Sequence, residues 1–103
     1  MKKKHVMPFF LTHAKKYLDS IPDVDRGAIG RDIGAIVAGE LAFVSTKQLK
    51  GPVRELRVGH HRVTYFTIGT NIYFVRGFRK KSAKTPKNEI LYAEKIYKQL
   101  KSN

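Results

Sequence analysis

The chain has 103 residues and no cysteine, which fits a single domain and excludes both disulfide bonds and thiolate metal sites. Its 21 Lys and Arg residues outnumber its 8 Asp and Glu residues, so the formal net charge is +13. Because a charge of this size opposes compaction, we expect a polyanionic partner, which can be nucleic acid, an anionic membrane or an acidic protein. The most apolar window, IGAIVAGELAFV, is interrupted by Glu40 and is shorter than the roughly 20 residues of a membrane-spanning helix. We therefore predict a cytoplasmic protein of one domain, residues 1–103, with no membrane partner.

The N-terminal half predicts a short strand followed by two helices. HVMPFFL (residues 5–11) can form an edge strand, because Pro8 lacks the N–H group that the interior of a sheet requires. Thr12 is a candidate N-cap for a helix that ends at about residue 20. A second helix is expected over about residues 23–43, where apolar side chains recur at helical spacing. Its four glycines are interpreted as points of close approach to another element; they are Gly27, Gly30, Gly34 and Gly39.

The C-terminal half changes to the period-two alternation of strands. STKQLKGP (residues 45–52) has the composition of a loop, and three strands follow over residues 53–58, 61–68 and 71–78. Their short connections predict an antiparallel meander. A last helix is expected after Thr85, with Thr85 as its N-cap and a proline at its first position. The predicted fold class is α+β, in which a small antiparallel sheet, with a candidate N-terminal edge strand, packs with two N-terminal helices and one C-terminal helix.

Positive charge is concentrated in the second half of the chain. Residues 52–103 carry twelve Lys or Arg and three Asp or Glu. Three arginines lie on the three predicted strands of the meander, and their register decides whether they share one face. Three lysines follow where the last strand leaves the sheet. Together they would form a cationic surface for a phosphate backbone, because arginine grips phosphate bidentately and lysine acts as a point charge. The six residues are Arg57, Arg62, Arg76, Lys80, Lys81 and Lys84.

The histidines give a weaker indication of chemistry. His60 and His61 are candidate acid–base groups, because an imidazole can exchange a proton near neutral pH. The histidines show no spacing typical of metal ligands, and neither a glycine-rich phosphate loop nor a pair of carboxylates stands out. We therefore predict no metal and no cofactor.

Several short motifs, taken in order, resemble one known family. The chain looks like the RelE/ParE toxin superfamily and most resembles its HigB-like branch, often labelled phage-derived protein. The resemblance extends over roughly residues 49–97 and depends on the order and spacing of the fragments. The matching residues are Leu49-Lys50-Gly51, Glu55-Leu56-Arg57-Val58, Arg62-Val63, Tyr65, Gly77-Phe78, Lys80-Lys81, Lys84-Thr85-Pro86, Glu89-Ile90 and Ala93.

This resemblance implies the toxin of a two-gene toxin–antitoxin module that is neutralised by a cognate antitoxin protein. Such toxins usually cleave mRNA on the ribosome without a metal, by attack of the ribose 2′-OH on the adjacent phosphate. Matched residue by residue, the resemblance implies catalytic roles for Arg57, Arg62, Lys81 and Lys84. Further contacts with RNA are expected from Arg54, Arg76, Arg79, Lys80 and Lys87.

The chain also departs from the family pattern. Several RelE-type toxins carry a Tyr or His base on or just before the last helix, whereas residues 85–90 contain neither and Tyr92 lies inside the predicted helix. Arg79 stands where the family often has an uncharged residue. The acid–base pair could therefore come from His60, His61 and the lysines. Two alternatives stay open: a ParE-like toxin that inhibits DNA gyrase, and a basic RNA-binding protein without catalysis.

Overall fold

The computed structural model describes residues 6–102, which form five strands and three helices. The strands make one sheet in the order β1-β5-β4-β3-β2, in which β1 is parallel to β5 and every other neighbouring pair is antiparallel. In chain order the elements are β1 (Met7–Phe10), α1 (Thr12–Ser20), α2 (Asp23–Ala38), β2 (Ser45–Lys50), β3 (Val53–Val58), β4 (His61–Ile68), β5 (Asn71–Arg79) and α3 (Lys87–Lys101).

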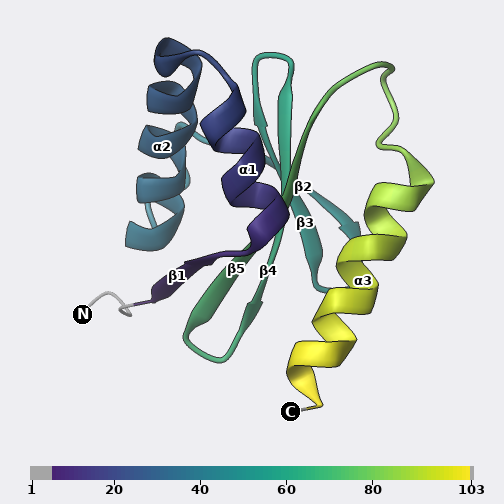
Figure 1. Cartoon of the computed structure of the whole chain (residues 1–103). Helices are drawn as coiled ribbons and strands as arrows, with labels where there is room; N and C mark the ends of the chain where they lie inside the picture. Colours follow the sequence, from purple (N-terminus) through teal and green to yellow (C-terminus); the bar gives the residue numbers. More distant parts are fainter. Residues whose placement is uncertain (1–5, 103) are drawn as a thin grey trace.

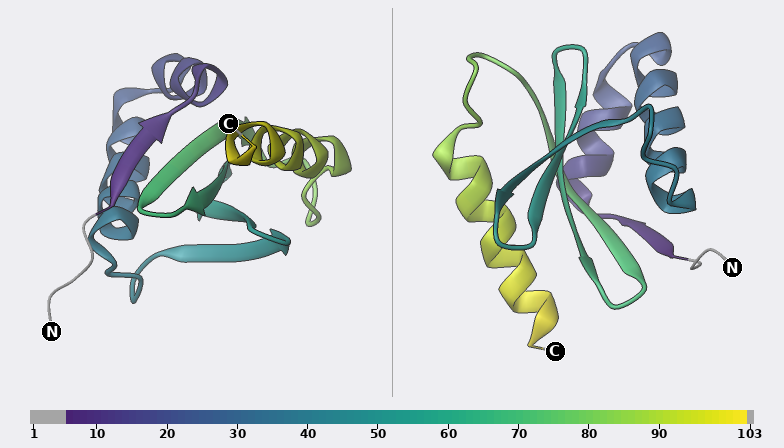
Figure 2. Two further views of the ribbon diagram at one scale, coloured as in Figure 1. Left: turned by 90° about the horizontal axis from the view of Figure 1, so that it is seen from below. Right: turned by 180° about the vertical axis from the view of Figure 1, so that it is seen from behind.

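Helices cover both faces of the sheet. α1 and α2 lie on one side and α3 lies on the other, as the views from the front, below and behind agree (Figures 1 and 2). The core is divided accordingly. Ile29 and Ile33 of α2 belong to one buried cluster with Leu56 of β3, whereas Ala93 of α3 belongs to a second cluster with Phe66 of β4.

The predicted α+β class, the antiparallel meander and the arrangement of two helices before the sheet and one after it are confirmed. The N-terminal edge strand is also confirmed as β1, which contains Pro8 and lies at the end of the sheet. His5, the first residue of that predicted strand, lies outside the described residues. None of the helices in the described part of the chain is long and apolar enough to cross a bilayer.

The predicted loop at residues 45–52 is wrong over most of its length, because residues 45–50 form β2. This strand pairs with β3 along the edge of the sheet, with a bulge between Gln48 and Lys50. Thr46 and Leu49 are half-buried, while the other four residues of β2 are exposed. An edge strand of this kind needs few apolar side chains, so it lacks the alternation by which the three inner strands were predicted.

The second helix is shorter than predicted and ends at Ala38. Gly39 adopts a left-handed conformation with φ of 76°, and its N–H group points to the carbonyl oxygens of Ala35 and Ile36. A residue in this conformation ends a helix, and glycine adopts it without steric cost. Residues 40–43 therefore lie outside the helix.

Neither predicted threonine N-cap is confirmed. Leu11 precedes α1 and Pro86 precedes α3 in the capping position, and neither helix start has a hydrogen bond from a capping side chain. Thr12 is the first residue of α1. The hydroxyl group of Thr85 is turned toward the sheet, where it contacts a buried carboxylate.

The interpretation of the four glycines of the second helix as points of close approach is also wrong. A Cβ atom at any of these four positions would have no packing neighbour within 4 Å. The close approach occurs in β5 instead. There, a Cβ atom on Gly77 would lie 2.6 Å from Cγ and 2.9 Å from Cβ of Tyr17, so α1 rests directly on the backbone of β5.

Candidate nucleic-acid interface

Two arginines face each other on adjacent strands. Arg57 in β3 is paired directly with Arg62 in β4, and Arg62 is paired with Phe78 in β5. Paired residues project to the same side of a sheet. Val53, on the same side of β3 as Arg57, packs in the α3 cluster, so both guanidinium groups emerge on the face that carries α3. Like charges placed directly opposite each other are destabilising, and this pair therefore needs a neighbouring anion.

Glu55 supplies that anion from within the sheet. Its side chain is only 1% exposed. One carboxylate oxygen, Oε2, accepts a hydrogen bond from Nε of Arg57 at 3.0 Å, and the other, Oε1, accepts one from the hydroxyl group of Thr85 at 2.7 Å. A buried carboxylate is tolerated when its oxygens are hydrogen-bonded and paired with positive charge, as they are here.

Residues 80–86, which we call the basic loop, connect β5 to α3 beside this arginine pair. The loop leaves the sheet next to the hairpin between β3 and β4 (Figure 1), where the N–H group of Lys80 donates to the carbonyl oxygen of His60 at 2.8 Å. It closes a small pocket against the sheet, which we call the cationic pocket. This pocket is lined by Glu55, Arg62, Phe78 and residues 80–86.

The cationic pocket is too small to admit a nucleotide. Its cavity volume is about 10 Å³, which is no more than the space of one water molecule. The lysines of the basic loop, Lys80, Lys81 and Lys84, are exposed at its mouth. A phosphate backbone would therefore lie across the outside of the loop, in contact with exposed ammonium groups.

Arg62 is held at the edge of the pocket by the hairpin itself. Its Nη1 atom donates to the carbonyl oxygen of Gly59 at 2.8 Å and to that of His61 at 2.9 Å. Three of the four predicted catalytic cations thus line one pocket, namely Arg62, Lys81 and Lys84. Arg57, the fourth, is bonded to a carboxylate of the same pocket. We call these four residues together with Lys80 the cationic surface.

Arg76 emerges on the same face but is engaged with α3. Its Nε atom lies 3.4 Å from Oε1 of Glu89, and its guanidinium carbon lies 5.0 Å from the centre of the Tyr92 ring. Oε1 of Glu89 is buried and has no hydrogen-bond partner in the described part of the chain, so the ion pair with Arg76 compensates its charge. Arg76 therefore supports the packing of α3 on the sheet.

The remaining predicted RNA contacts do not meet at the pocket. Arg54 and Arg79 project to the opposite face of the sheet, which α1 and α2 cover, because side chains alternate along a strand. Lys87 is exposed at the start of α3 and does not line the pocket. Of the five residues predicted to make additional RNA contacts, Lys80 is the one that lines it.

The histidines are also separated from the cationic surface. His61 is 6% exposed and lies on the face of α1 and α2. Its Nε2 atom is 2.9 Å from Oδ2 of Asp25, and its Nδ1 atom is 2.6 Å from the hydroxyl oxygen of Tyr17. These contacts fit a ring that donates from Nε2 to the carboxylate and accepts at Nδ1 from the phenol. The structure therefore does not bring His61 to the pocket, and His60 is exposed in the turn between β3 and β4.

The phenol of Tyr17, which contacts His61, has a shifted pKa. Burial raises the pKa of its phenol above the ordinary value of 10.0. The positive charge of Arg79 opposes this rise, and the negative charge of Asp25 adds to it. A phenol with a raised pKa stays protonated at neutral pH, which suits a hydrogen-bond donor to His61 and not a base.

Sequence reasoning missed two residues of the site, Glu55 and Thr85. Glu55 lies two residues before Arg57 on the same side of a predicted strand, and an acidic residue so placed beside a basic one is a usable signal for an ion pair. Thr85 precedes a proline at a helix start, a position that favours an N-cap by local rules. Its contact with Glu55 joins positions 30 residues apart, and local rules do not detect such contacts.

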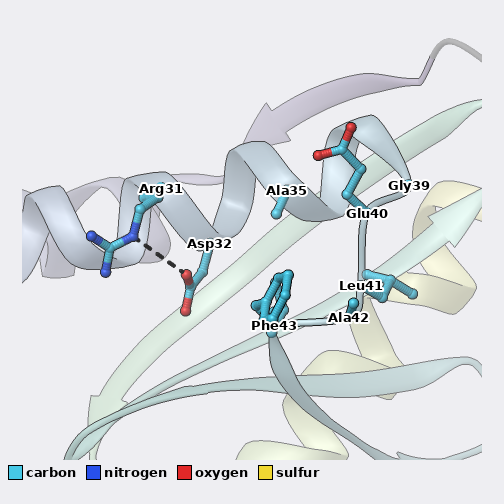
Figure 3. Close-up of a pocket in the computed structure, with 9 residues that line it drawn as sticks. Arg31, Asp32, Ala35, Gly39, Glu40, Leu41, Ala42 and Phe43 are labelled. Carbon is cyan, nitrogen blue, oxygen red and sulfur yellow. Dashed lines mark ion pairs between the residues drawn. The ribbon is translucent and has the colours of Figure 1, made fainter.

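A larger hollow of about 820 Å³ lies beside the C-terminal end of α2 (Figure 3). Leu41 and Phe43 line it, and Phe43 is 97% exposed. Its charged lining residues are Asp32, Glu40 and Arg31, with Arg31 Nε 3.9 Å from Oδ1 of Asp32. Because acidic groups outnumber basic ones and the rest of the lining is largely apolar, this hollow does not suit a phosphate.

Comparison with known proteins places the chain in a family. The profile of the Gp49-like phage-derived protein family matches residues 16–98. The chain belongs to this family. Relatives of this Gp49-like chain from two strains of Mycobacterium tuberculosis, CDC 1551 / Oshkosh and ATCC 25618 / H37Rv, are both named probable endoribonuclease HigB1. Each is 35% identical over 91 residues, covering 82% of this chain and 73% of the relative. The resemblance to HigB-like toxins that was inferred from residues 49–97 is thereby confirmed.

Solved structures show that the Gp49-like chain has a RelE-like fold. The RelE–RelB complex of Pyrococcus horikoshii is similar with a TM-score of 0.63 and 15% identity, covering 77% of this chain and 99% of that one. The RelB–RelE antitoxin–toxin complex of Methanococcus jannaschii gives 0.61 and 23%, covering 69% and 88%. The RelBE2 toxin–antitoxin complex of Mycobacterium tuberculosis gives 0.60 and 20%, covering 73% and 98%.

Proposed function

We propose that this protein is the toxin of a toxin–antitoxin pair and that it cleaves RNA at the cationic surface. The observation that carries the proposal is the direct pairing of Arg57 with Arg62 on the sheet face where the basic loop exposes its lysines. Glu55 balances only one of the two positive charges, so an anionic ligand is a natural further partner for the arginine pair. The HigB1 relatives, named probable endoribonucleases, support RNA as that ligand.

The proposed reaction is a transfer of the phosphate within the RNA. The ribose 2′-oxygen loses its proton to a base and attacks the adjacent phosphorus. The bond to the 5′-oxygen breaks, and that oxygen takes up a proton, so the products are a 2′,3′-cyclic phosphate and a 5′-hydroxyl. Arg57 and Arg62 would stabilise the charge that develops on the phosphorane oxygens. Lys81 and Lys84 would carry the proton transfers at the exposed mouth of the pocket.

The shape of the interface favours an RNA substrate that is positioned by a partner and not by this protein. With a cavity volume of about 10 Å³, the cationic pocket holds no base, so the protein itself does little to orient the nucleotide. In this proposal the ribosome presents the mRNA to the cationic surface, and cleavage of free RNA is slow. Orientation of the reacting groups can contribute several orders of magnitude in rate.

The same surface is the proposed target of the antitoxin. Exposed lysines beside an arginine pair would attract an acidic segment, which would inhibit by covering the cations. The structural neighbours from the two archaea and from Mycobacterium tuberculosis are toxin–antitoxin complexes, which supports a protein partner of this kind.

A charge-matched pair of variants tests the proposed function. One variant replaces Arg62, Lys80, Lys81 and Lys84 by alanine and leaves Arg57 in place, so that Glu55 keeps its buried partner. The control removes the same four charges elsewhere on the exposed surface, through alanine at Lys15, Lys16, Lys95 and Lys98.

Growth inhibition and cleavage in a translation reaction, with and without ribosomes, are then measured, and the RNA ends are mapped. We expect the site variant to lose about 100-fold or more in cleavage rate, while the control cleaves normally. Growth inhibition that survives in the site variant would exclude the ribonuclease proposal and leave a toxin that acts on another target.

A further inference from the structure

A fully buried carboxylate lies next to the cations of a strongly basic protein. Glu55 has 0% exposure in a chain whose net charge is +13. Burying a carboxylate is costly unless its partners compensate for the loss of water. Its two partners come from different parts of the fold: Arg57 is two residues along the same strand, and Thr85 is 30 residues away at the end of the basic loop.

These two contacts join the two halves of the cationic surface. Arg57 belongs to the sheet, whereas Lys80, Lys81 and Lys84 belong to the basic loop. The backbone of the loop is tied to the β3–β4 hairpin at Lys80, its first residue. The bond from Thr85 to Glu55 ties down its other end. The segment that carries the lysines is therefore tied to the sheet at both ends.

The Glu55 contact also sets the orientation of Arg57. The carboxylate is bonded to Nε, and in the described part of the chain no hydrogen bond uses the two terminal nitrogens of Arg57. Those nitrogens form the outer edge of the guanidinium group and are free to grip a phosphate oxygen pair. Glu55 thus reduces the repulsion between Arg57 and Arg62 without occupying the edge that a phosphate needs.

We propose that Glu55 is a positioning residue, which latches the basic loop to β3 through Thr85 and orients Arg57, so that cations from sheet and loop face one phosphate. This role rests on the proposed function, and it explains how the cations are held in position before RNA binds. Glu55 does not act as the base, because its side chain is only 1% exposed and both of its oxygens accept hydrogen bonds.

The latch is tested by removing one hydroxyl group without changing any charge. Thr85→Val keeps the shape of the side chain but leaves Oε1 of Glu55 without its donor. Thr85→Ser restores the donor and should restore the function. The control is Thr67→Val, which makes the same chemical change at an exposed position of β4 outside the pocket lining.

Two readouts are compared: amide hydrogen exchange of residues 80–86, and kcat and KM for ribosome-bound mRNA. In Thr85→Val we expect faster exchange in the basic loop and a kcat that falls about 10- to 100-fold, with KM nearly unchanged because every charge is kept. Thr85→Ser and Thr67→Val should behave like the original protein. Normal exchange, or faster exchange with normal kcat, would overturn the positioning role.

Glu55→Gln separates positioning from proton transfer. A glutamine can accept from Arg57 through its oxygen and donate to the Thr85 hydroxyl through its nitrogen, so the basic loop should stay latched, and the cleavage rate should fall only modestly because the arginine pair loses its neighbouring anion. A fall of about 100-fold or more in Glu55→Gln with unchanged loop exchange would assign the base role to Glu55 and contradict the latch. If the unaltered protein cleaves no RNA but Thr85→Val still loosens the loop, the proposed function fails while the latch itself is supported.

Discussion

The side chain of Tyr17 in α1 approaches the backbone of β5 closely at Gly77. Tyr17 lies across the backbone of β5, where Gly77 has no side chain to obstruct it. In Gly77→Ala the new methyl group would lie 2.6 Å from Cγ of Tyr17, so α1 or β5 must shift. We expect the free energy of unfolding to fall by about 1–3 kcal/mol, the usual effect of overpacking. Urea denaturation measures this change.

Gly27→Ala is the matched control for that substitution. It adds the same methyl group at an exposed position of α2, where the methyl group would have no packing neighbour within 4 Å. There the higher helix propensity of alanine should raise the free energy of unfolding by up to about 1 kcal/mol. Equal effects of the two substitutions, in sign and size, would show that α1 does not rest on β5 at Gly77.

Tyr17 also gives stability a dependence on alkaline pH. In the folded protein the pKa of this phenol is raised above its ordinary value of 10.0. Between pH 10 and the folded-state pKa, the folded state therefore binds more protons than the unfolded state. The stabilisation from the protonated phenol is therefore complete below pH 10 and is lost as the pH rises through the folded-state pKa. Tyr17→Phe should destabilise the protein by about 1–2 kcal/mol at neutral pH, because His61 loses its donor.

That penalty should shrink when unfolding is measured at increasing pH above about 10, since only the unsubstituted protein carries this titration. Tyr97→Phe is the control. Its ring packs edge-on against Phe66, and its hydroxyl makes no hydrogen bond with the described residues, so at neutral pH its loss should lower the free energy of unfolding less than Tyr17→Phe does. A Tyr17→Phe penalty that is constant from neutral to alkaline pH would contradict the burial of this phenol.

At the scale of elements, sequence patterns predict what is stabilised by burial. The inner strands β3 to β5 show period-two alternation or runs of apolar and aromatic residues, and Ile29, Ile33 and Ile36 form one buried stripe on α2, so both patterns are visible in the sequence. β2 was missed because an edge strand with exposed polar side chains resembles a loop in composition. α2 ends at one left-handed residue, Gly39. This residue is the last of four spaced glycines, and the sequence alone does not distinguish it from the other three.

Only the part of the site that lies close together in the sequence could be predicted. The cations at the strand-to-helix connection are contiguous in sequence, so their gathering was predictable. Which strand arginines join them depends on alternation and register: Arg57 and Arg62 share the α3 face, whereas Arg54 and Arg79 do not. The Glu55–Thr85 bond was not predictable, because it requires the path of the basic loop over the sheet.

At the scale of the whole molecule, the helices on the two sides of the sheet separate the buried His61 network from the cationic surface. α1 and α2 cover the face that buries His61, and α3 lies on the other side of the sheet (Figure 1). The cationic surface lies on the α3 side, at the loop that precedes α3. The net charge of +13 would attract any polyanion to the molecule at long range. The cationic surface differs from this general attraction, because Glu55 and the hairpin hold its two arginines in place and its lysines lie on a loop tied to the sheet at both ends.

Salt dependence distinguishes these two contributions to RNA binding. Each phosphate neutralised on single-stranded RNA releases counterions, and the logarithm of the association constant falls with the logarithm of salt concentration with a slope of about −0.7 per contact. We expect Lys81→Ala to make this slope shallower by about 0.7, because it removes one direct contact. Lys98→Ala, at an exposed position near the end of α3, removes the same charge without a contact and should leave the slope unchanged. Titration of a labelled RNA from about 50 to 200 mM salt measures both slopes, and equal slopes for the two variants would mean that RNA is held by net charge alone.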